Sequence, residues 1–112
     1  MTDPVKFLLV DDLEENLLAL EALLASEGLD LHKAQSGEEA LELMLANEYA
    51  LALLDVQMPG MDGFETARLI RARGLADAPI LVVSANAYGE DVARSEAAGC
   101  DAFLPKPVDI AR

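Results

Sequence analysis

Apolar and polar positions along the chain follow two different spacings, and these alternate. Short apolar runs, typical of strands, are separated by stretches in which apolar residues recur every three or four positions, as on one face of a helix. The expected strands occupy residues 6–10, 29–34, 49–55, 78–84 and 101–107. The expected helices occupy residues 14–27, 36–48, 63–74 and, more weakly, 90–99. Strands that alternate with helices in this way predict a parallel sheet with helices on both of its faces.

Capping and turn residues support these boundaries. Ser36 and Glu39 have the spacing of a capping box at the start of a helix. Gly28 stands where the first helix should end. After the last strand, the sequence VDIAR has room for only about one turn of a fifth helix. We therefore expect residues 1–112 to be a single domain, taken from a longer chain and truncated within its last helix.

Composition narrows the class of protein. With 112 residues and 53% hydrophobic content, the chain can form one core, which leaves no room for separate catalytic and substrate domains. The formal net charge of -13, with only eight Lys and Arg residues, disfavours binding to the phosphate backbone of a nucleic acid. A single cysteine gives no disulfide framework, and no segment has the pattern of a signal peptide or a membrane helix. We expect a soluble, cytoplasmic module.

Four of the five expected strands end in polar side chains of the kinds that bind metals or take part in reactions. These residues are Asp11 and Asp12, Asp55, Ser84 and Lys106. In an open parallel sheet, ligands bind beyond the carboxyl ends of the strands, so these side chains should meet at one edge. Three converging carboxylates repel one another unless a cation lies between them, and an all-oxygen site suits Mg²⁺. Together with a lysine, such a site could accept a dianionic group and let a carboxylate attack phosphorus.

A purely structural explanation exists for each of these residues taken alone. Asp11 or Asp12 could cap the first helix, and Asp62 has the position of an N-cap for the third. Asp, Ser and Lys are also common in loops. That explanation weakens when all of these side chains are expected at the same edge, because loop residues have no reason to converge there. His32 lies in the alternating second strand, where we interpret it as a solvated side chain without a role.

Four segments together resemble a known family. The segments LLVDD (8–12), LLDVQMPGMDG (53–63), VVSANA (82–87) and FLPKP (103–107) match, in order and spacing, the receiver domain of a two-component response regulator. The resemblance extends over the whole chain except the last helix. It implies an α/β, flavodoxin-like, doubly wound five-stranded parallel sheet with strand order 2-1-3-4-5, whose fifth helix is largely missing. It also implies a regulatory phosphoacceptor domain rather than an enzyme that acts on an external substrate.

The resemblance assigns roles to the polar residues. Asp55 would be the phosphoacceptor, which attacks the phosphorus of a phosphohistidine on a histidine kinase or a histidine phosphotransfer protein. Asp12 and Asp55 would ligate Mg²⁺, or alternatively Mn²⁺, together with the backbone carbonyl of Gln57, while Asp11 would act through water. Lys106 would pair with a phosphoryl oxygen.

Further residues would respond to the phosphoryl group or set its lifetime. Ser84 would hydrogen-bond the group after transfer and, with Phe103, form the conformational switch. Phe103 also fits a plain core position, and the two roles are compatible because a switch needs one side chain with two packings of similar free energy. Gln57 and Asn86 would flank the hydrolytic water. Both are neutral amides without a strong general base between them, so we expect a phosphoryl group that lasts for minutes or longer.

Some details resemble receivers of hybrid histidine kinases and phosphorelays, among them Asn16 and Asp91. The first helix would then belong to the docking face for the phosphodonor, with Leu13, Asn16 and Leu17 as candidates, although Leu17 also fits the core. A stand-alone regulator that binds a downstream protein is the main alternative, and an output domain or a homodimer are further expected partners. We expect neither a nucleic acid nor a membrane as a partner of this domain.

Two other classes of protein fit the residues less well. A metal-dependent phosphohydrolase would need a substrate pocket and a well-placed general acid or base, which the expected edge does not supply. A flavodoxin-type cofactor carrier would need a phosphate-binding loop after the first strand, where this chain has Asp11 and Asp12.

Overall fold

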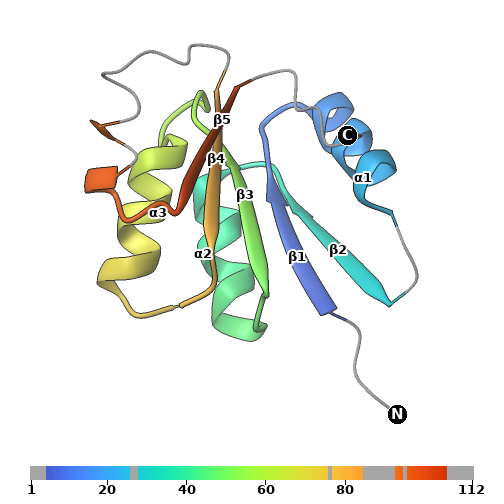
Figure 1. Ribbon diagram of the computed structural model, residues 1–112, viewed down its shortest axis with the longest axis horizontal. Coiled ribbons are helices and arrows are strands. Elements are labelled where there is room, and N and C mark those ends of the chain that lie inside the picture. Colours follow the sequence, from blue (N-terminus) through green and yellow to red (C-terminus); the bar gives the residue numbers. More distant parts are fainter. Residues whose placement is uncertain (1–4, 26–27, 76, 85–92, 95, 106–112) are drawn as a thin grey trace.

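The computed structural model describes residues 5–25, 28–75, 77–84, 93–94 and 96–105 of the chain. These residues form a five-stranded sheet in the order β2-β1-β3-β4-β5, in which each neighbouring pair is parallel (Figure 1). The strands are β1 (Val5–Val10), β2 (Leu29–Ala34), β3 (Leu51–Asp55), β4 (Ile80–Ser84) and β5 (Ala102–Pro105). The expected fold class and strand order are confirmed.

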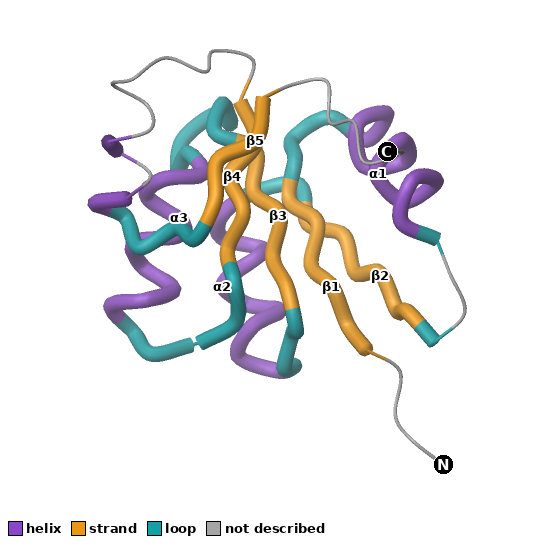
Figure 2. Tube along the Cα trace, viewed as in Figure 1, coloured by secondary structure: helices purple, strands orange, loops and turns teal. Residues whose placement is uncertain are grey.

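Helices cover both faces of the sheet. They are α1 (Glu14–Leu24), α2 (Gly37–Ala46) and α3 (Gly63–Ala72). The helices α2 and α3 lie side by side on one face, and α1 lies on the other (Figure 1 and Figure 2). Within the described part of the chain, no helix is long and apolar enough to cross a membrane.

The two faces of the sheet have separate hydrophobic cores. Leu8 of β1 and Ile70 of α3 belong to the larger core, which α2 and α3 cover. Leu9 of β1 and Leu53 of β3 belong to the smaller core, together with Leu17 of α1. Successive side chains of a strand point to opposite faces, so a strand that is covered on both sides must be apolar throughout. For this reason the central strands were recognisable as uninterrupted apolar runs.

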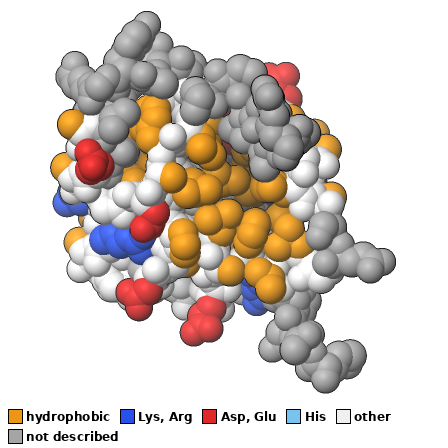
Figure 3. Space-filling model, viewed as in Figure 1, with side chains coloured by type: hydrophobic (Ala, Val, Ile, Leu, Met, Phe, Trp, Pro, Cys, Tyr) orange, Lys and Arg blue, Asp and Glu red, His pale blue; other side chains and the backbone are white. Residues whose placement is uncertain are grey.

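The smaller core extends from α1 toward the far edge of the sheet. Leu81 of β4 and Leu104 of β5 are partly buried and pack against it. Hydrophobic side chains accordingly gather over the middle of the molecule in Figure 3.

Helix α1 is shorter than the sequence predicted. It ends at Leu24, and Ala25 already has non-helical backbone angles (φ -59°, ψ 127°), whereas we expected helix as far as residue 27. The cause lies in the pairing of β2 with β1. Gly28 has a positive φ of 80°, and its carbonyl accepts a hydrogen bond from the backbone N–H of Val5 at 2.9 Å. The chain must leave the helix early for Gly28 to reach the start of β1.

The expected caps of α2 and α3 are present. The Ser36 hydroxyl accepts from the backbone N–H of Glu39 at 3.1 Å, and the Asp62 carboxylate accepts from that of Glu65 at 2.8 Å. The Glu39 carboxylate reaches back to the N–H of Gln35 at 2.8 Å, one residue before the position that a capping box predicts. Both helix starts are therefore fixed by side chains close in sequence.

Helix α1 begins differently, and this corrects one structural alternative. Its N-cap is Leu13, without a side-chain cap. The suggestion that Asp11 or Asp12 caps α1 is therefore wrong, since a cap must be the residue that flanks the helix.

The last part of the chain agrees with the sequence where it is described. The strands β3 and β4 begin two residues later than predicted and β5 begins one residue later, while residues 106 and 107 of the last prediction lie outside the described part. Residues 93, 94, 96 and 97 are helical, which fits the weak fourth helix predicted over residues 90–99, while residues 85–92 and 95 lie outside the described part.

Candidate functional site

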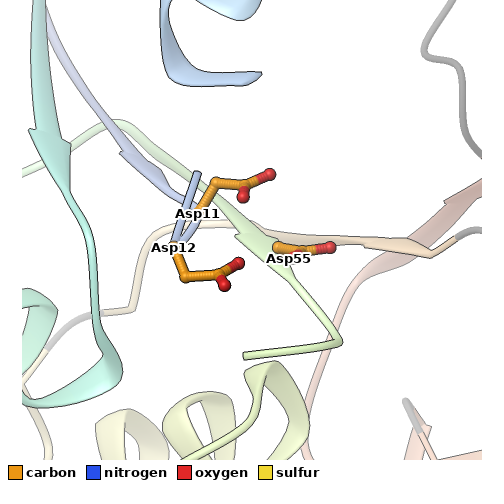
Figure 4. Close-up of side chains that lie close together, drawn as sticks. All are labelled: Asp11, Asp12 and Asp55. Atoms are coloured by element: carbon orange, nitrogen blue, oxygen red, sulfur yellow. The ribbon is translucent and has the colours of Figure 1, made fainter. Parts of the chain in front are cut away.

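The strand register brings three acidic residues to one edge of the sheet. Val10 pairs with Leu54, so Asp11 leaves β1 at the level where Asp55 ends β3. One carboxylate oxygen from each of Asp11, Asp12 and Asp55 lies within 4.8 Å of the other two. Figure 4 shows the three side chains close together at the ends of neighbouring strands. The predicted convergence of these carboxylates is confirmed.

The burial of these residues makes their mutual repulsion significant. Asp11 is 2% exposed and Asp55 is 5% exposed, while Asp12 is partly exposed. Like charges at this separation repel one another, more strongly where water is scarce. An oxygen-only donor set with a partly open side fits a hard divalent cation such as Mg²⁺, which keeps several of its waters. The residues present therefore fit the metal that the sequence predicted.

Asp11 is oriented from the loop and the helix that follow it. One carboxylate oxygen, Oδ1, accepts from the backbone N–H of Leu13 at 3.0 Å, and the other, Oδ2, accepts from the Asn16 side chain at 3.2 Å. Its own backbone N–H donates to the carbonyl of Ala34 in the neighbouring strand β2 at 3.1 Å. Both the backbone and the carboxylate of Asp11 are thus fixed.

Asp55 is held between β4 and the start of α3. The backbone N–H of Val56 donates to the carbonyl of Val83 at 3.0 Å, and that of Gly63 donates to the carbonyl of Val56 at 3.0 Å. A methyl group added at Gly63 would come within 3.0 Å of the carbonyl carbon and oxygen of Asp55. Gly63 does not have a positive φ, so this close approach, not backbone conformation, is what requires a glycine there.

The other predicted site residues are placed as follows. Ser84 ends β4 and is 1% exposed. Gln57 is exposed, two residues after Asp55. Phe103 in β5 is partly buried and packs against the larger core, as the core interpretation predicted. Lys106 and Asn86 lie outside the described residues, so their roles stay predictions.

The structure also separates the residues proposed for docking. Leu17 is 2% exposed and belongs to the core on the α1 side, whereas Leu13 is 48% exposed. Asn16 turns its amide toward Asp11, a contact that sequence spacing alone did not reveal. The only signal for it was an Asn in the first turn of a helix, where its propensity is poor.

The interpretation of His32 as a solvated side chain is wrong. Its Nδ1 lies 2.8 Å from the Tyr49 hydroxyl, and its Nε2 lies 3.0 Å from a carboxylate oxygen of Asp30. An ionised carboxylate can only accept, so Nε2 donates to Asp30, while the Tyr49 hydroxyl, which can donate or accept, is the partner of Nδ1. The Tyr49 ring packs edge-on against the imidazole, with 5.3 Å between ring centroids. His32 therefore cross-links the edge strand to the start of β3.

Comparison with known proteins identifies the family. A family model described as the response regulator receiver domain matches residues 7–112. The chain belongs to the receiver domain family. The response regulator MprA of Mycobacterium sp. (strain KMS) is 42% identical over 105 residues, which is 93% of this chain and 45% of that protein. The sensor histidine kinase RcsC of Escherichia coli (strain K12) is 37% identical over 108 residues, or 96% of this chain and 11% of that protein.

Solved structures agree with this family. The chemotaxis protein CheY4 of Vibrio cholerae superimposes with a TM-score of 0.88 at 28% identity, and the match covers 95% of this chain and 89% of that one. The receiver domain thus spans most of a CheY4-like chain but less than half of MprA or RcsC. The acidic cluster of this receiver domain lies where parallel α/β sheets bind ligands, beyond the carboxyl ends of the strands.

Proposed function

We propose that this receiver domain takes a phosphoryl group from a phosphohistidine onto Asp55. An oxygen of the Asp55 carboxylate would form a bond to phosphorus as the bond between phosphorus and the histidine nitrogen breaks. The proposal rests chiefly on one observation, the convergence of Asp55 with Asp11 and Asp12 at the edge of the sheet. A rigid mount also supports it, because Asp55 ends a buried strand that is hydrogen-bonded on both sides.

Mg²⁺ would be held by Asp12, Asp55 and the backbone carbonyl of Gln57, with Asp11 acting through water. When bound, the ion supplies positive charge that offsets the carboxylates and the incoming phosphoryl oxygens. Among the residues of the chain, Lys106 would pair with one phosphoryl oxygen. Ser84, which ends the strand next to β3, would donate its hydroxyl to another.

The response to phosphorylation would run through Ser84 and Phe103. Phe103 lies in β5, whose neighbour β4 ends in Ser84. A movement of Ser84 toward the phosphoryl group would change the packing available to the ring. The neutral side chains of Gln57 and Asn86 would leave the phosphoryl group without a strong general base nearby, which favours a lifetime of minutes or longer.

The partner would be a histidine kinase or a histidine phosphotransfer protein, in the cytoplasm. The matched region makes up 11% of a sensor histidine kinase and 45% of a response regulator, which supports a module of a larger signalling chain. A hybrid kinase in a phosphorelay is the arrangement that we propose, and a stand-alone regulator with a protein target or a homodimer is the alternative. The domain would act as a regulator, and not as an enzyme on external substrates.

The decisive experiment is intact-protein mass spectrometry after incubation with Mg²⁺ and acetyl phosphate. We expect one added phosphoryl group in the parent chain and none in Asp55→Asn. Asp62→Asn is the matched control, because it removes a carboxylate from the same loop while asparagine still caps α3. A folded parent that gains no phosphoryl group, or an Asp55→Asn variant that still gains one, would contradict the proposal.

A further inference from the structure

Asn16 is hydrogen-bonded to one carboxylate of the acidic cluster formed by Asp11, Asp12 and Asp55. It is the third residue of α1, and its side-chain amide donates to Oδ2 of Asp11 at 3.2 Å. The other oxygen of that carboxylate accepts from the backbone N–H of Leu13. A backbone donor is present whatever the sequence, whereas the hydrogen bond from Asn16 depends on the identity of that residue.

The chemistry of an amide suits this position. The amide is neutral, so it can fix the Asp11 carboxylate without reducing the negative charge of the cluster that attracts a cation. A Lys or Arg here would offer the same kind of hydrogen bond but would compete with the cation for Asp11. An acidic side chain would add a fourth negative charge to the three that already lie within 4.8 Å of one another.

We propose that Asn16 is a positioning residue that sets the affinity of the acidic cluster for Mg²⁺ by holding Asp11. This inference rests on the proposed function, since it assumes that the cluster binds the metal. Residues that hydrogen-bond a direct metal ligand fix its direction, and their loss typically weakens metal binding by about 10- to 100-fold; Asp11 would act through water, so the lower end of this range applies to Asn16. Asn16 therefore acts on the metal site from α1, and not as an outward-facing docking residue.

The test measures Mg²⁺ binding by calorimetric titration of the metal alone, without a phosphodonor. Two variants remove the donor in different ways. Asn16→Leu keeps the heavy-atom count and the branching of the side chain, and Asn16→Ala introduces the residue with the best helix propensity, so that α1 is not weakened. We expect the dissociation constant for Mg²⁺ to rise about 10-fold or more in both variants.

Asn47→Leu is the matched control. The Asn47 side chain donates to the carbonyl of Leu43 at 3.1 Å and accepts from Lys6 at 3.2 Å, at the C-terminal end of α2. Its replacement should lower the free energy of unfolding while leaving the Mg²⁺ dissociation constant unchanged. This control separates loss of the fold from loss of the metal site.

A second readout distinguishes positioning from general damage. In a phosphorylation assay with acetyl phosphate, the Asn16 variants should need more Mg²⁺ for half-maximal rate but should reach the parent rate at saturation. Parent-like Mg²⁺ affinity in either Asn16 variant would overturn the inference and leave the proposed function standing. A parent chain that binds no Mg²⁺ would overturn the metal-dependent function and this inference together.

Discussion

At the carboxyl end of the sheet three carboxylates converge, whereas toward the amino end one carboxylate meets an imidazole and a phenol. In the first region Asp11, Asp12 and Asp55 bring like charges within 4.8 Å. In the second, Asp30 and Tyr49 each face one nitrogen of His32, at 3.0 Å and 2.8 Å. Both regions place polar groups on the same apolar scaffold, but the first brings three carboxylates together, whereas the second joins one carboxylate to an imidazole and a phenol.

The difference explains why we propose a metal site in the first region and interpret the second as a structural cross-link. In the second region the imidazole hydrogen-bonds both the carboxylate and the phenol, so these groups need no ligand to satisfy them. Three like charges in a poorly solvated place are stable only at a cost, which a cation can offset. The number of carboxylates that converge, and not polarity as such, therefore separates the two ends of this receiver domain.

The largest expected effect comes from removing one charge of the cluster. Asp12→Asn should weaken Mg²⁺ binding by more than about 100-fold, because it removes a ligand and not only a supporting hydrogen bond. Without metal, the same variant should be more stable to urea by on the order of 1 kcal/mol, because repulsion is relieved. Calorimetric titration and urea unfolding measure the two quantities.

Asp30→Asn at the other end of the sheet is the opposite case. It should leave Mg²⁺ binding unchanged and lower the free energy of unfolding, since His32 loses its charged partner. If Asp12→Asn lowered the stability of the metal-free chain instead, the three carboxylates would not be a destabilising cluster, and the comparison would fail.

A second prediction concerns how rigidly the backbone of Asp55 is held. Gly63→Ala should force the backbone of Asp55 and the start of α3 apart, because the new methyl group would meet backbone atoms of Asp55. A misplacement of about 1 Å lowers the rate of a well-oriented reaction by about 100-fold. We therefore expect about a 100-fold slower phosphorylation by acetyl phosphate, measured by mass spectrometry against time.

Gly37→Ala provides the control for crowding. Its added methyl group would meet side-chain atoms of Thr66 and Met61, with no contact to Asp55. This variant should lose stability but keep its rate of phosphorylation. Equal rates in the two variants would mean that Gly63 serves packing alone.

A third, smaller effect is expected at the end of the sheet where His32 lies. Tyr49 is 7% exposed, and Tyr49→Phe removes the hydroxyl that is hydrogen-bonded to Nδ1 of His32. The free energy of unfolding should fall by about 1 kcal/mol, the usual contribution of one such hydrogen bond. Urea unfolding checks this value, and Mg²⁺ titration should show no change. An altered Mg²⁺ affinity would mean that the two ends of the sheet are coupled.

The smallest effect concerns Cys100, which is remote from both regions. Burial raises the pKa of the Cys100 thiol from 9.0 to about 11, against the opposing influence of the Arg71 guanidinium. The thiol is thus held neutral in the folded chain. Its contribution to stability is fully present below about pH 9 and is lost as the pH rises toward about 11, because the unfolded chain deprotonates first.

Alkylation by iodoacetamide as a function of pH measures this pKa directly. In the folded chain, the rate should still be rising at pH 10, whereas in urea it should level off near the ordinary pKa of a thiol. Identical pH profiles in the two conditions would show that Cys100 is not buried enough for its thiol to be perturbed.

The alternation of strands with helices and the edge at which the acidic residues meet were predictable from spacing in the sequence, whereas the strand order followed from the family resemblance. The strands β1 and β3 are apolar because they are buried on both faces. Their parallel pairing brings Asp11 and Asp55, at their carboxyl ends, to the same edge. The caps Ser36 and Asp62 were predictable for a similar reason, since their partners lie three residues away. Interactions of this kind are local, or they repeat along a strand, and so leave a pattern in the sequence.

Only the tertiary structure decided which single side chains meet across the fold. The spacing of residues did not predict the contact between His32 and Tyr49, nor that Asn16 turns toward Asp11 and not outward. The need for a glycine at position 63 arises from the backbone of Asp55, eight residues earlier in the chain and on another element. These contacts depend on distances between elements, which packing sets to fractions of an ångström and which no periodicity records.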